Sequence, residues 1–365
     1  MLKPQSFVIL RKIVLNDDLQ NSMRPGYLIL ADGTIFSGQM PSWQSGAING
    51  EAVFTTGMTG YVESLTDPSY ARQILTFTYP LIGNYGVMDR EYWESDRIHA
   101  AGVVTSEVYE QNHLPKKRVS FLRWLKEQDV PLLTGVDTRA LTKHLRVYGT
   151  MPASISQQPD APSSWPTPLP PQVSIKQPIS YNEKESQTIL LVDCGLKEGI
   201  LRALQKFPVK IKRVPHDYDY SRESFDGVVV SNGPGDPTDY PKTITILRQA
   251  FATSKPILGI CLGSQLMGLA AGAKTYKLKF GHRGHNQPCM DETGKCYVTS
   301  QNHGYAVDEK TLPPDWKVTF RNLHDQSVEG IAHKTKPFFS VQFHPEASPG
   351  PLDTSWLFAD FIKKL

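Results

Sequence analysis

The pattern of hydrophobic and polar positions divides the chain into two halves of different character. In the first half, short runs rich in β-branched residues are bounded by Gly, Asp and Pro, as is typical of strands. These predicted strands are residues 26–30, 50–55, 73–78 and 101–104. Helices are predicted over 118–128 and 137–146, where apolar residues recur one turn apart and Asp137 can cap the second helix. This half is therefore predicted to be a mixed α/β domain.

The second half alternates continuous apolar runs with helical patterns. The runs predict strands over 188–192, 209–214, 227–231 and 257–260. Helices are predicted over 196–206, near 243–252 and directly after Cys261. Fully apolar strands between helices indicate a doubly wound, mostly parallel sheet that is covered on both faces. Residues 297–342 are strand-rich, and 354–364 are predicted to form a last helix.

A proline-rich stretch separates the halves. Residues 157–178 contain seven prolines, a density that sustains neither a helix nor a central strand. We therefore predict an N-terminal extension over 1–22, a first domain over 23–156, a linker over 157–186 and a second domain over 187–365. The first 22 residues lack a clear period, so a start of translation at Met23 is an alternative.

Composition and charge exclude several classes of protein. With 39 Lys and Arg against 36 Asp and Glu, the net charge of +3 supplies no clustered basic field for nucleic acid. No apolar stretch approaches the roughly 20 residues of a membrane span, and the run at 6–10 is too short for a signal peptide. Four cysteines are too few for a secreted disulfide scaffold. The sequence predicts a cytoplasmic protein with no nucleic-acid or membrane partner.

The strongest chemical signal is the pentapeptide GICLG at 259–263, between a predicted buried strand and a helix. It is a nucleophile-elbow pattern with Cys261 in the nucleophile position. Such a turn crowds the backbone, so the flanking Gly259 and Gly263 are expected to be small for steric reasons. It also lifts the side chain to the carboxyl edge of the sheet, where a helix N-terminus favours a thiolate. A buried structural cysteine is the alternative, and it suits Cys194 better.

A thiolate nucleophile needs a base and a group that orients the base. The strand predicted to end at Phe343 is followed by His344-Pro345-Glu346. Histidine at a strand end, with a carboxylate two residues later, suits a Cys–His–Glu triad in which Glu346 fixes the imidazole tautomer. The tripeptide is weak evidence alone and gains its weight from Cys261.

A third element, SNGPGDP at 231–237, follows another buried strand. Its glycines let backbone N–H groups approach a ligand, as an oxyanion hole requires. A simple turn would also fit. Neither a phosphate-binding loop nor a dinucleotide-binding fingerprint occurs, so no ATP or dinucleotide chemistry is predicted on this chain.

A zinc site could be drawn from His282, His285, Cys289 and Cys296. Their spacing lacks the paired cysteines of common structural sites. We interpret them instead as loop residues near the active site and predict no bound metal.

Three segments of the first half are distinctive, namely TTGMTGY at 55–61, LTDPSY at 65–70 and TYPLIGN at 78–84. The second half, with its elbow, His-Pro-Glu and glycine loop, resembles the class I glutamine amidotransferases, which have a flavodoxin-like sheet. The three segments are similar to motifs of the carbamoyl-phosphate synthetase small-chain family and narrow the resemblance to it. Other amidotransferases do not carry them. The resemblance covers the chain from about residue 24 to its end, apart from much of the linker.

The resemblance implies a glutaminase that passes ammonia to a separate large ATP-dependent chain. That partner, in a heterodimer with this chain, would make carbamoyl phosphate from bicarbonate for arginine and pyrimidine synthesis. ATP and magnesium are expected on the partner, and no cofactor on this chain. Cys261 matches the nucleophile, His344 the acid/base and Glu346 its orienter. The positions that match L-glutamine contacts are Ser69, Gly233, Gly235, Leu262, Gln265, Asn302, Gly304 and Tyr305.

The sequence departs from the family pattern at three places. Ser264 stands where His is usual, Tyr305 where Phe is common, and Gln287 replaces the usual His of Asn-His-Pro. None of these is a triad member. The alternatives that remain at this point are another amidotransferase, for anthranilate or GMP synthesis, a non-catalytic regulatory or scaffold subunit with a glutaminase fold, and a zinc-binding module.

Overall fold

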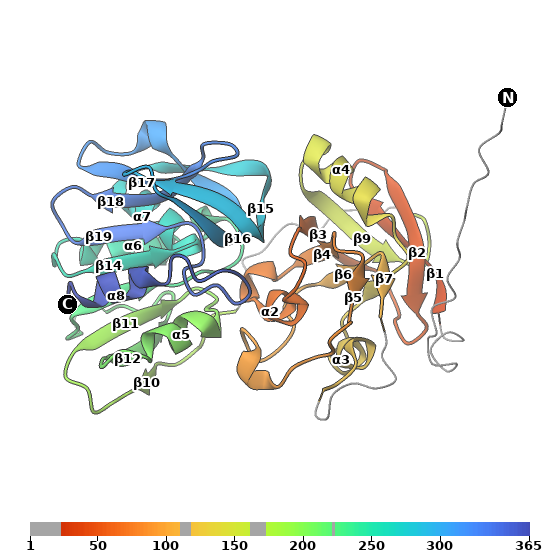
Figure 1. Ribbon diagram of the computed structural model, residues 1–365, viewed down its shortest axis with the longest axis horizontal. Helices are drawn as coiled ribbons and strands as arrows, with labels where there is room; N and C mark the ends of the chain where they lie inside the picture. The colour runs from red at the N-terminus through yellow and green to blue at the C-terminus, as the bar shows by residue number, and fades with distance from the viewer. Residues whose placement is uncertain (1–22, 110–117, 161–172, 221–222) are drawn as a thin grey trace.

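A computed structural model describes residues 23–109, 118–160, 173–220 and 223–365. The predicted N-terminal extension and most prolines of the predicted linker lie outside these residues. The chain forms two lobes side by side, each built around its own sheet (Figure 1). No described helix combines the length and apolar character that crossing a membrane demands.

The first lobe holds a seven-stranded mixed sheet in the order β2-β1-β9-β3-β4-β6-β8. Its strands are β1 Met23–Leu30, β2 Ile35–Pro41, β3 Ile48–Thr55, β4 Gln73–Phe77, β6 Gly102–Val104, β8 Leu132–Leu133 and β9 Met151–Ser156. A small sheet pairs β5 Leu81–Ile82 with β7 Glu107–Val108, and the helices are α2 Tyr61–Thr66, α3 Phe121–Glu127 and α4 Thr138–Tyr148. The predicted mixed α/β domain is confirmed, and Asp137 caps α4 by accepting the N–H of Ala140 at 2.8 Å.

The second lobe holds a ten-stranded sheet in the order β10-β12-β11-β13-β14-β19-β18-β17-β15-β16. Its parallel centre consists of β11 Thr188–Asp193, β12 Lys210–Pro215, β13 Gly227–Val230, β14 Ile257–Ile260 and β19 Phe338–Val341. An antiparallel part adds β15 Lys274–Asp291, β16 Cys296–Asp308, β17 Trp316–Asn322 and β18 Val328–His333. The helices are α5 Glu198–Leu204, α6 Pro241–Ala250, α7 Leu262–Ala271 and α8 Trp356–Ile362.

Helices cover both faces of the parallel centre, as the apolar runs predict. Along β11, Leu190 and Val192 pack in one cluster with side chains of α6 and α7, whereas Ile189 and Leu191 pack in another with α5 and α8. Residues alternate between the two faces of a strand, so a strand buried on both sides is apolar throughout. The α/β class, with a doubly wound second domain, is therefore confirmed.

Two segments differ from the sequence-based expectation. Within the predicted linker, β10 Ile179–Tyr181 pairs antiparallel with β12 and forms an edge of the second sheet. The interpretation of His282, His285 and Cys289 as loop residues is wrong, since they lie in β15, and Cys296 begins β16. Polar residues on this long, irregular hairpin obscure the alternation from which a strand is recognised, and the register shifts twice along it.

Candidate active site

Cys261 lies on a strained turn between β14 and α7. Its backbone adopts φ 55° and ψ −106°, a conformation that a non-glycine residue rarely takes, and its side chain is buried. A Cβ atom on Gly263 would lie 2.2 Å from the carbonyl oxygen of Val230, and one on Gly259 would lie 2.6 Å from the carbonyl oxygen of Gly263. The two glycines are therefore required by sterics, which is the arrangement of a nucleophile elbow.

This crowding leads to a stability prediction. Gly263→Ala forces its new methyl group against backbone rather than a movable side chain, so we expect a loss of about 1–3 kcal/mol in the free energy of unfolding and a misplaced thiol. Chemical denaturation of both proteins measures the loss. Gly294→Ala, at a turn with nothing within 4 Å of its Cβ position, is the matched control and carries only the strain of its φ of +88°. Equal losses in the two variants would contradict the steric argument.

His344 and Glu346 form a buried pair just beyond β19. Nδ1 of His344 lies 2.7 Å from Oε1 of Glu346, and the backbone N–H of His344 donates to the carbonyl oxygen of Ser300 at 2.9 Å. This contact orients the ring. Nε2 of His344 is buried without a hydrogen-bond partner among the described residues, which leaves it available for proton transfer.

Lys197, at the start of α5, completes the charge arrangement. Its Nζ lies 3.0 Å from Oε1 of Glu346 and donates to the carbonyl oxygen of Ala347 at 2.7 Å. Burial opposes its charge, but Glu346 and Glu94 raise the pKa of Lys197 to about 12. Sequence analysis missed this residue, because a single lysine before a helix carries no pattern of its own.

The charges shift the pKa values of the buried pair in opposite directions. Burial opposes both ionised forms, but Lys197 and His344 lower the pKa of Glu346 to about 2. Burial and the charge of Lys197 lower the pKa of His344. Glu346 and Cys261 outweigh them and raise this pKa to about 10. The imidazole is therefore held as a cation beside an ionised carboxylate at neutral pH.

The loop after β13 brings backbone close to the elbow. A Cβ on Gly233 would lie 2.1 Å from the carbonyl oxygen of Cys194, and Gly235 has a φ of +89°. Only glycine fits both conditions without strain. Leu262 is the first residue of α7, so its N–H belongs to the donors that a helix leaves without an internal acceptor. These backbone groups are suited to holding an oxyanion.

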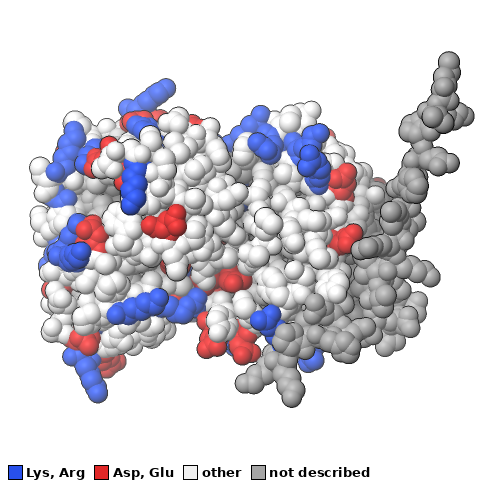
Figure 2. Space-filling model, viewed as in Figure 1, with Lys and Arg blue, Asp and Glu red and all other residues white. Residues whose placement is uncertain are grey.

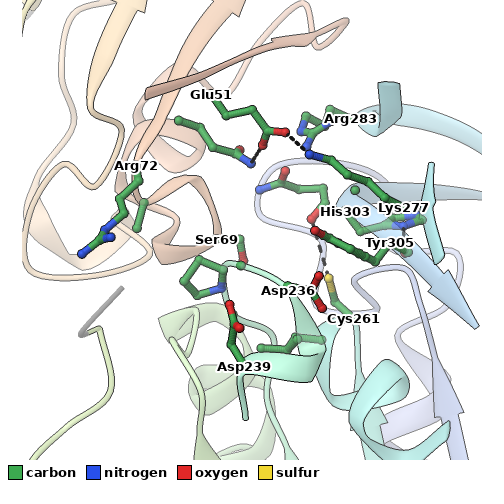
Figure 3. Close-up of a pocket in the computed structure, with 18 of the residues that line it drawn as sticks. Glu51, Ser69, Arg72, Asp236, Asp239, Cys261, Lys277, Arg283, His303 and Tyr305 are labelled. Carbon is green, nitrogen blue, oxygen red and sulfur yellow. Dashed lines mark hydrogen bonds and ion pairs between the residues drawn. The ribbon is translucent and has the colours of Figure 1, made fainter. Parts of the chain in front are cut away.

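A cavity of about 440 Å³ lies over Cys261 and reaches the first lobe (Figure 3). All of the predicted glutamine contacts line it together with Cys261. They are Ser69, Gly233, Gly235, Leu262, Gln265, Asn302, Gly304 and Tyr305. His344 and Glu346 are not among its lining residues and are themselves buried. Sequence positions more than 230 residues apart therefore meet around one thiol.

The first lobe supplies part of the cavity wall through Ser69. Nδ2 of Asn232 donates to Oγ of Ser69 at 2.9 Å, and Nδ2 of Asn302 donates to Oδ2 of Asp67 at 3.1 Å. Asp67 also accepts the N–H of Ser69 at 2.8 Å, so these buried side chains fix the two lobes together at the cavity. Sequence analysis did not single out Asp67 and Asn232, although both belong to the segments LTDPSY and SNGPGDP that it quoted.

Two of the predicted contacts are held by other polar groups. Nε2 of Gln265 donates to the carbonyl oxygen of Tyr305 at 2.8 Å and to Oε1 of Gln342 at 3.1 Å. The unusual Ser264 is buried and its Oγ lies 2.8 Å from Oγ of Ser340. Ser264 therefore has a structural partner away from the triad.

The possible zinc ligands His282, His285, Cys289 and Cys296 do not form one group of metal-binding side chains among the described residues. Cys296 is exposed, whereas Cys289 is buried and contacts Oγ1 of Thr299 at 3.5 Å. The described residues instead place His282, His303 and Glu329 within one buried group. Both ring nitrogens of His282 face carboxylates, which outweigh the effect of burial and raise its pKa to about 9. His282 therefore pairs with the carboxylates of Asp325 and Glu329 in this group.

The elbow, the buried His–Glu pair and the glycine loop define a class I glutamine amidotransferase, and the family description "Glutamine amidotransferase class-I" matches residues 190–364. The description "Carbamoyl-phosphate synthase small chain, CPSase domain" matches residues 28–155. The chain belongs to the carbamoyl-phosphate synthase small-chain family. This confirms the resemblance and argues against an amidotransferase for anthranilate or GMP synthesis.

Two relatives found by sequence agree with the family. The arginine-specific small chain of carbamoyl phosphate synthase from Aspergillus oryzae is 49% identical over 354 residues, covering 91% of this chain and 78% of its own. The multifunctional protein CAD of Squalus acanthias is 46% identical over 92% of this chain but only 16% of its own. A solved glutamine amidotransferase from Thermotoga maritima is 21% identical over 44% of this chain and 76% of its own, with a TM-score of 0.36.

Proposed function

We propose that this chain hydrolyses L-glutamine to glutamate and ammonia as the glutaminase subunit of a carbamoyl-phosphate synthase, with Cys261, His344 and Glu346 as its catalytic triad. One observation carries the proposal: a cysteine on a strained elbow shares a cavity with every predicted glutamine contact, and the histidine of a buried His–Glu pair is close enough for Cys261 to raise its pKa. The family membership supports the reaction class, and the geometry supports the role proposed for each residue.

The reaction proceeds by acyl transfer. The thiolate of Cys261 attacks the carboxamide carbon of glutamine, and the resulting oxyanion accepts hydrogen bonds from the N–H of Leu262 and from the loop at 233–235. The imidazolium of His344 gives its proton to the departing ammonia, leaving a thioester on Cys261. The neutral imidazole then takes a proton from water, which attacks the thioester and releases glutamate. Glu346 keeps the ring in one orientation through both steps.

The ammonia requires an acceptor that this chain does not provide. The proposed partner is a large ATP-dependent chain that binds ATP and magnesium and joins ammonia to bicarbonate, and the two chains form a heterodimer. Carbamoyl phosphate made there serves arginine and pyrimidine synthesis, the former being named in the fungal relatives. We place the protein in the cytoplasm and propose no nucleic-acid partner. On the face that Figure 2 shows, acidic and basic side chains are interspersed rather than sorted into a basic stripe.

Purification of the tagged chain from its native host tests the subunit assignment. We expect a large ATP-binding synthetase chain in stoichiometric amount. A different synthase in its place would retain the glutaminase chemistry and reassign the pathway. Recovery of the chain alone, at a salt concentration that preserves other complexes, would contradict the assignment. A catalytically inactive scaffold is the second candidate, but no feature of the described triad favours it.

A further inference from the structure

Arg283, on β15, is a buried cation in the wall of the cavity that none of the assignments above uses. It is only 5% exposed, yet it lines the cavity that contains Cys261. Its Cα pairs with that of Asn302 on the neighbouring strand, so the two side chains point to the same face of the hairpin. Nη2 of Arg283 lies 3.3 Å from the position that a Cβ on Gly304 would occupy. The guanidinium therefore lies next to Gly304, and its strand position pairs with Asn302, both of them predicted glutamine contacts.

The hydrogen-bonding capacity of this guanidinium is only partly used within the described residues. Nη1 donates to the carbonyl oxygen of Phe280 at 2.6 Å, whereas Nε is buried without an acceptor. A buried donor without an acceptor costs free energy. Within the described residues this donor is thus unsatisfied, and it is suited to an anionic group that enters the cavity.

The other cation beside it is already paired. Nζ of Lys277 lies 2.7 Å from Oε1 of Glu51 (Figure 3). The side chain of Lys277 is 49% exposed. Burial works against the ionised form of Glu51, but the charges of Arg283 and Lys277 hold its pKa below the ordinary value. Glu51 thus balances the local charge from the first lobe, while its nearest direct partner is Lys277.

The first lobe also fixes the position of Arg283. The backbone N–H of Thr56 donates to the carbonyl oxygen of Arg283 at 3.2 Å, and Oγ1 of Thr56 lies 3.3 Å from the same oxygen. Correct placement of the guanidinium therefore depends on contact between the lobes. The cavity also contains the carboxylates of Asp236 and Asp239, so it presents both signs of charge. A zwitterionic amino acid needs such a site.

We propose that Arg283 is a specificity-determining residue that binds the α-carboxylate of L-glutamine. This inference rests on the proposed glutaminase function and adds to it the feature that distinguishes the amino acid from a simple amide. Arginine presents several donors in a fixed plane and pairs with a carboxylate through more than one hydrogen bond. Because the α-carboxylate does not react, its binding is equally strong in the ground state and the transition state. The interaction should therefore act on KM rather than on kcat.

The experiment compares Arg283→Met with the unaltered protein in the complete two-chain enzyme. The substrates are L-glutamine and 4-aminobutanamide, which is glutamine without its α-carboxylate; ammonia release is measured for both, and the analogue is tested as a competitive inhibitor where its turnover is slow. We expect kcat/KM for glutamine to fall about 10- to 100-fold, mainly through KM, with no more than about a threefold change for the analogue. Arg283→Lys should recover part of the loss. Arg123→Met, which removes an exposed arginine of α3 outside the cavity, is the matched control and should change neither value.

The outcomes separate this inference from the proposed function. Equal losses for glutamine and its analogue in Arg283→Met, or a loss confined to kcat, would show that Arg283 only supports the structure and would overturn the inference. An unaltered enzyme that releases no glutamate from glutamine would instead overturn the proposed function. Size-exclusion chromatography identifies a variant that fails to assemble. In that case Arg283→Lys, which retains the charge, decides between a role of Arg283 in binding the α-carboxylate and a purely structural role.

Discussion

Cys261→Ala is expected to abolish glutamine hydrolysis while the two-chain enzyme still makes carbamoyl phosphate from added ammonia. Alanine removes the thiol proposed to form the thioester, and neither His344 nor the proposed oxyanion donors can replace it. Loss of a nucleophile costs about 10⁴-fold or more in kcat in enzymes whose catalytic groups act as a unit. Glutamate release measures the first activity, and ammonia-dependent carbamoyl-phosphate formation measures the second.

The matched control for this prediction is Cys296→Ala. Cys296 is the exposed cysteine, and the chain needs it neither for packing nor for the proposed chemistry, so both activities should be unchanged. Persistent glutamine hydrolysis in Cys261→Ala would move the reaction to another nucleophile and contradict the triad. Loss of both activities together would indicate damage to the assembly, because the acceptor chemistry does not pass through the thiol.

The elements that sequence analysis located best are those with a local physical cause. The run at 257–260 and the structural β14 coincide, because a strand buried on both faces must be apolar at every position. Asp137 was identifiable as a cap since its side chain satisfies a nearby N–H of the same helix. The elbow glycines were identifiable because the requirement for them is steric and arises within a segment of five residues. In each case the determining contacts are close in sequence.

Features made by distant contacts were not predictable in the same way. Lys197 gains its role only when β19 places Glu346 beside it, 149 positions away. The hairpin of β15 and β16 carries polar residues on both strands because it faces the cavity and the first lobe, so its alternation is weak. The residue types of the proposed triad could be chosen from the sequence, whereas the charge balance around His344 and Glu346 depends on a lysine that no motif contains.

That charge balance leads to the second large effect, a change in pH dependence in Glu346→Gln. The pKa of His344 is raised above its ordinary value of 6.5 to about 10, so the stability from its protonation is complete below pH 6.5 and is lost as pH rises through 10. The pKa of Glu346 is lowered from 4.5 to about 2, so its contribution is complete above pH 4.5 and is lost as pH falls through 2. Both contributions are therefore complete between pH 4.5 and 6.5.

For the reaction, the relevant group is the imidazolium that protonates departing ammonia. The unaltered protein should keep the alkaline limb of its kcat/KM profile at about pH 10, the pKa of His344. The substitution Glu346→Gln removes the main charge that raises the pKa of His344, whereas burial and Lys197 continue to lower it. We expect the limb to move down by about four units, to near pH 6, with a loss of roughly 100-fold at pH 8 and only about twofold at pH 6.

A pH–rate profile of kcat/KM for both proteins measures this shift. Glu292→Gln is the control, because Glu292 forms an exposed ion pair with Lys317 and has no contact with the triad. Its profile should overlay that of the unaltered protein. A Glu346→Gln profile that falls uniformly, with its alkaline limb still near pH 10, would mean that the carboxylate only orients the ring. A shifted limb would mean that the negative charge of Glu346 keeps His344 protonated for proton transfer to ammonia.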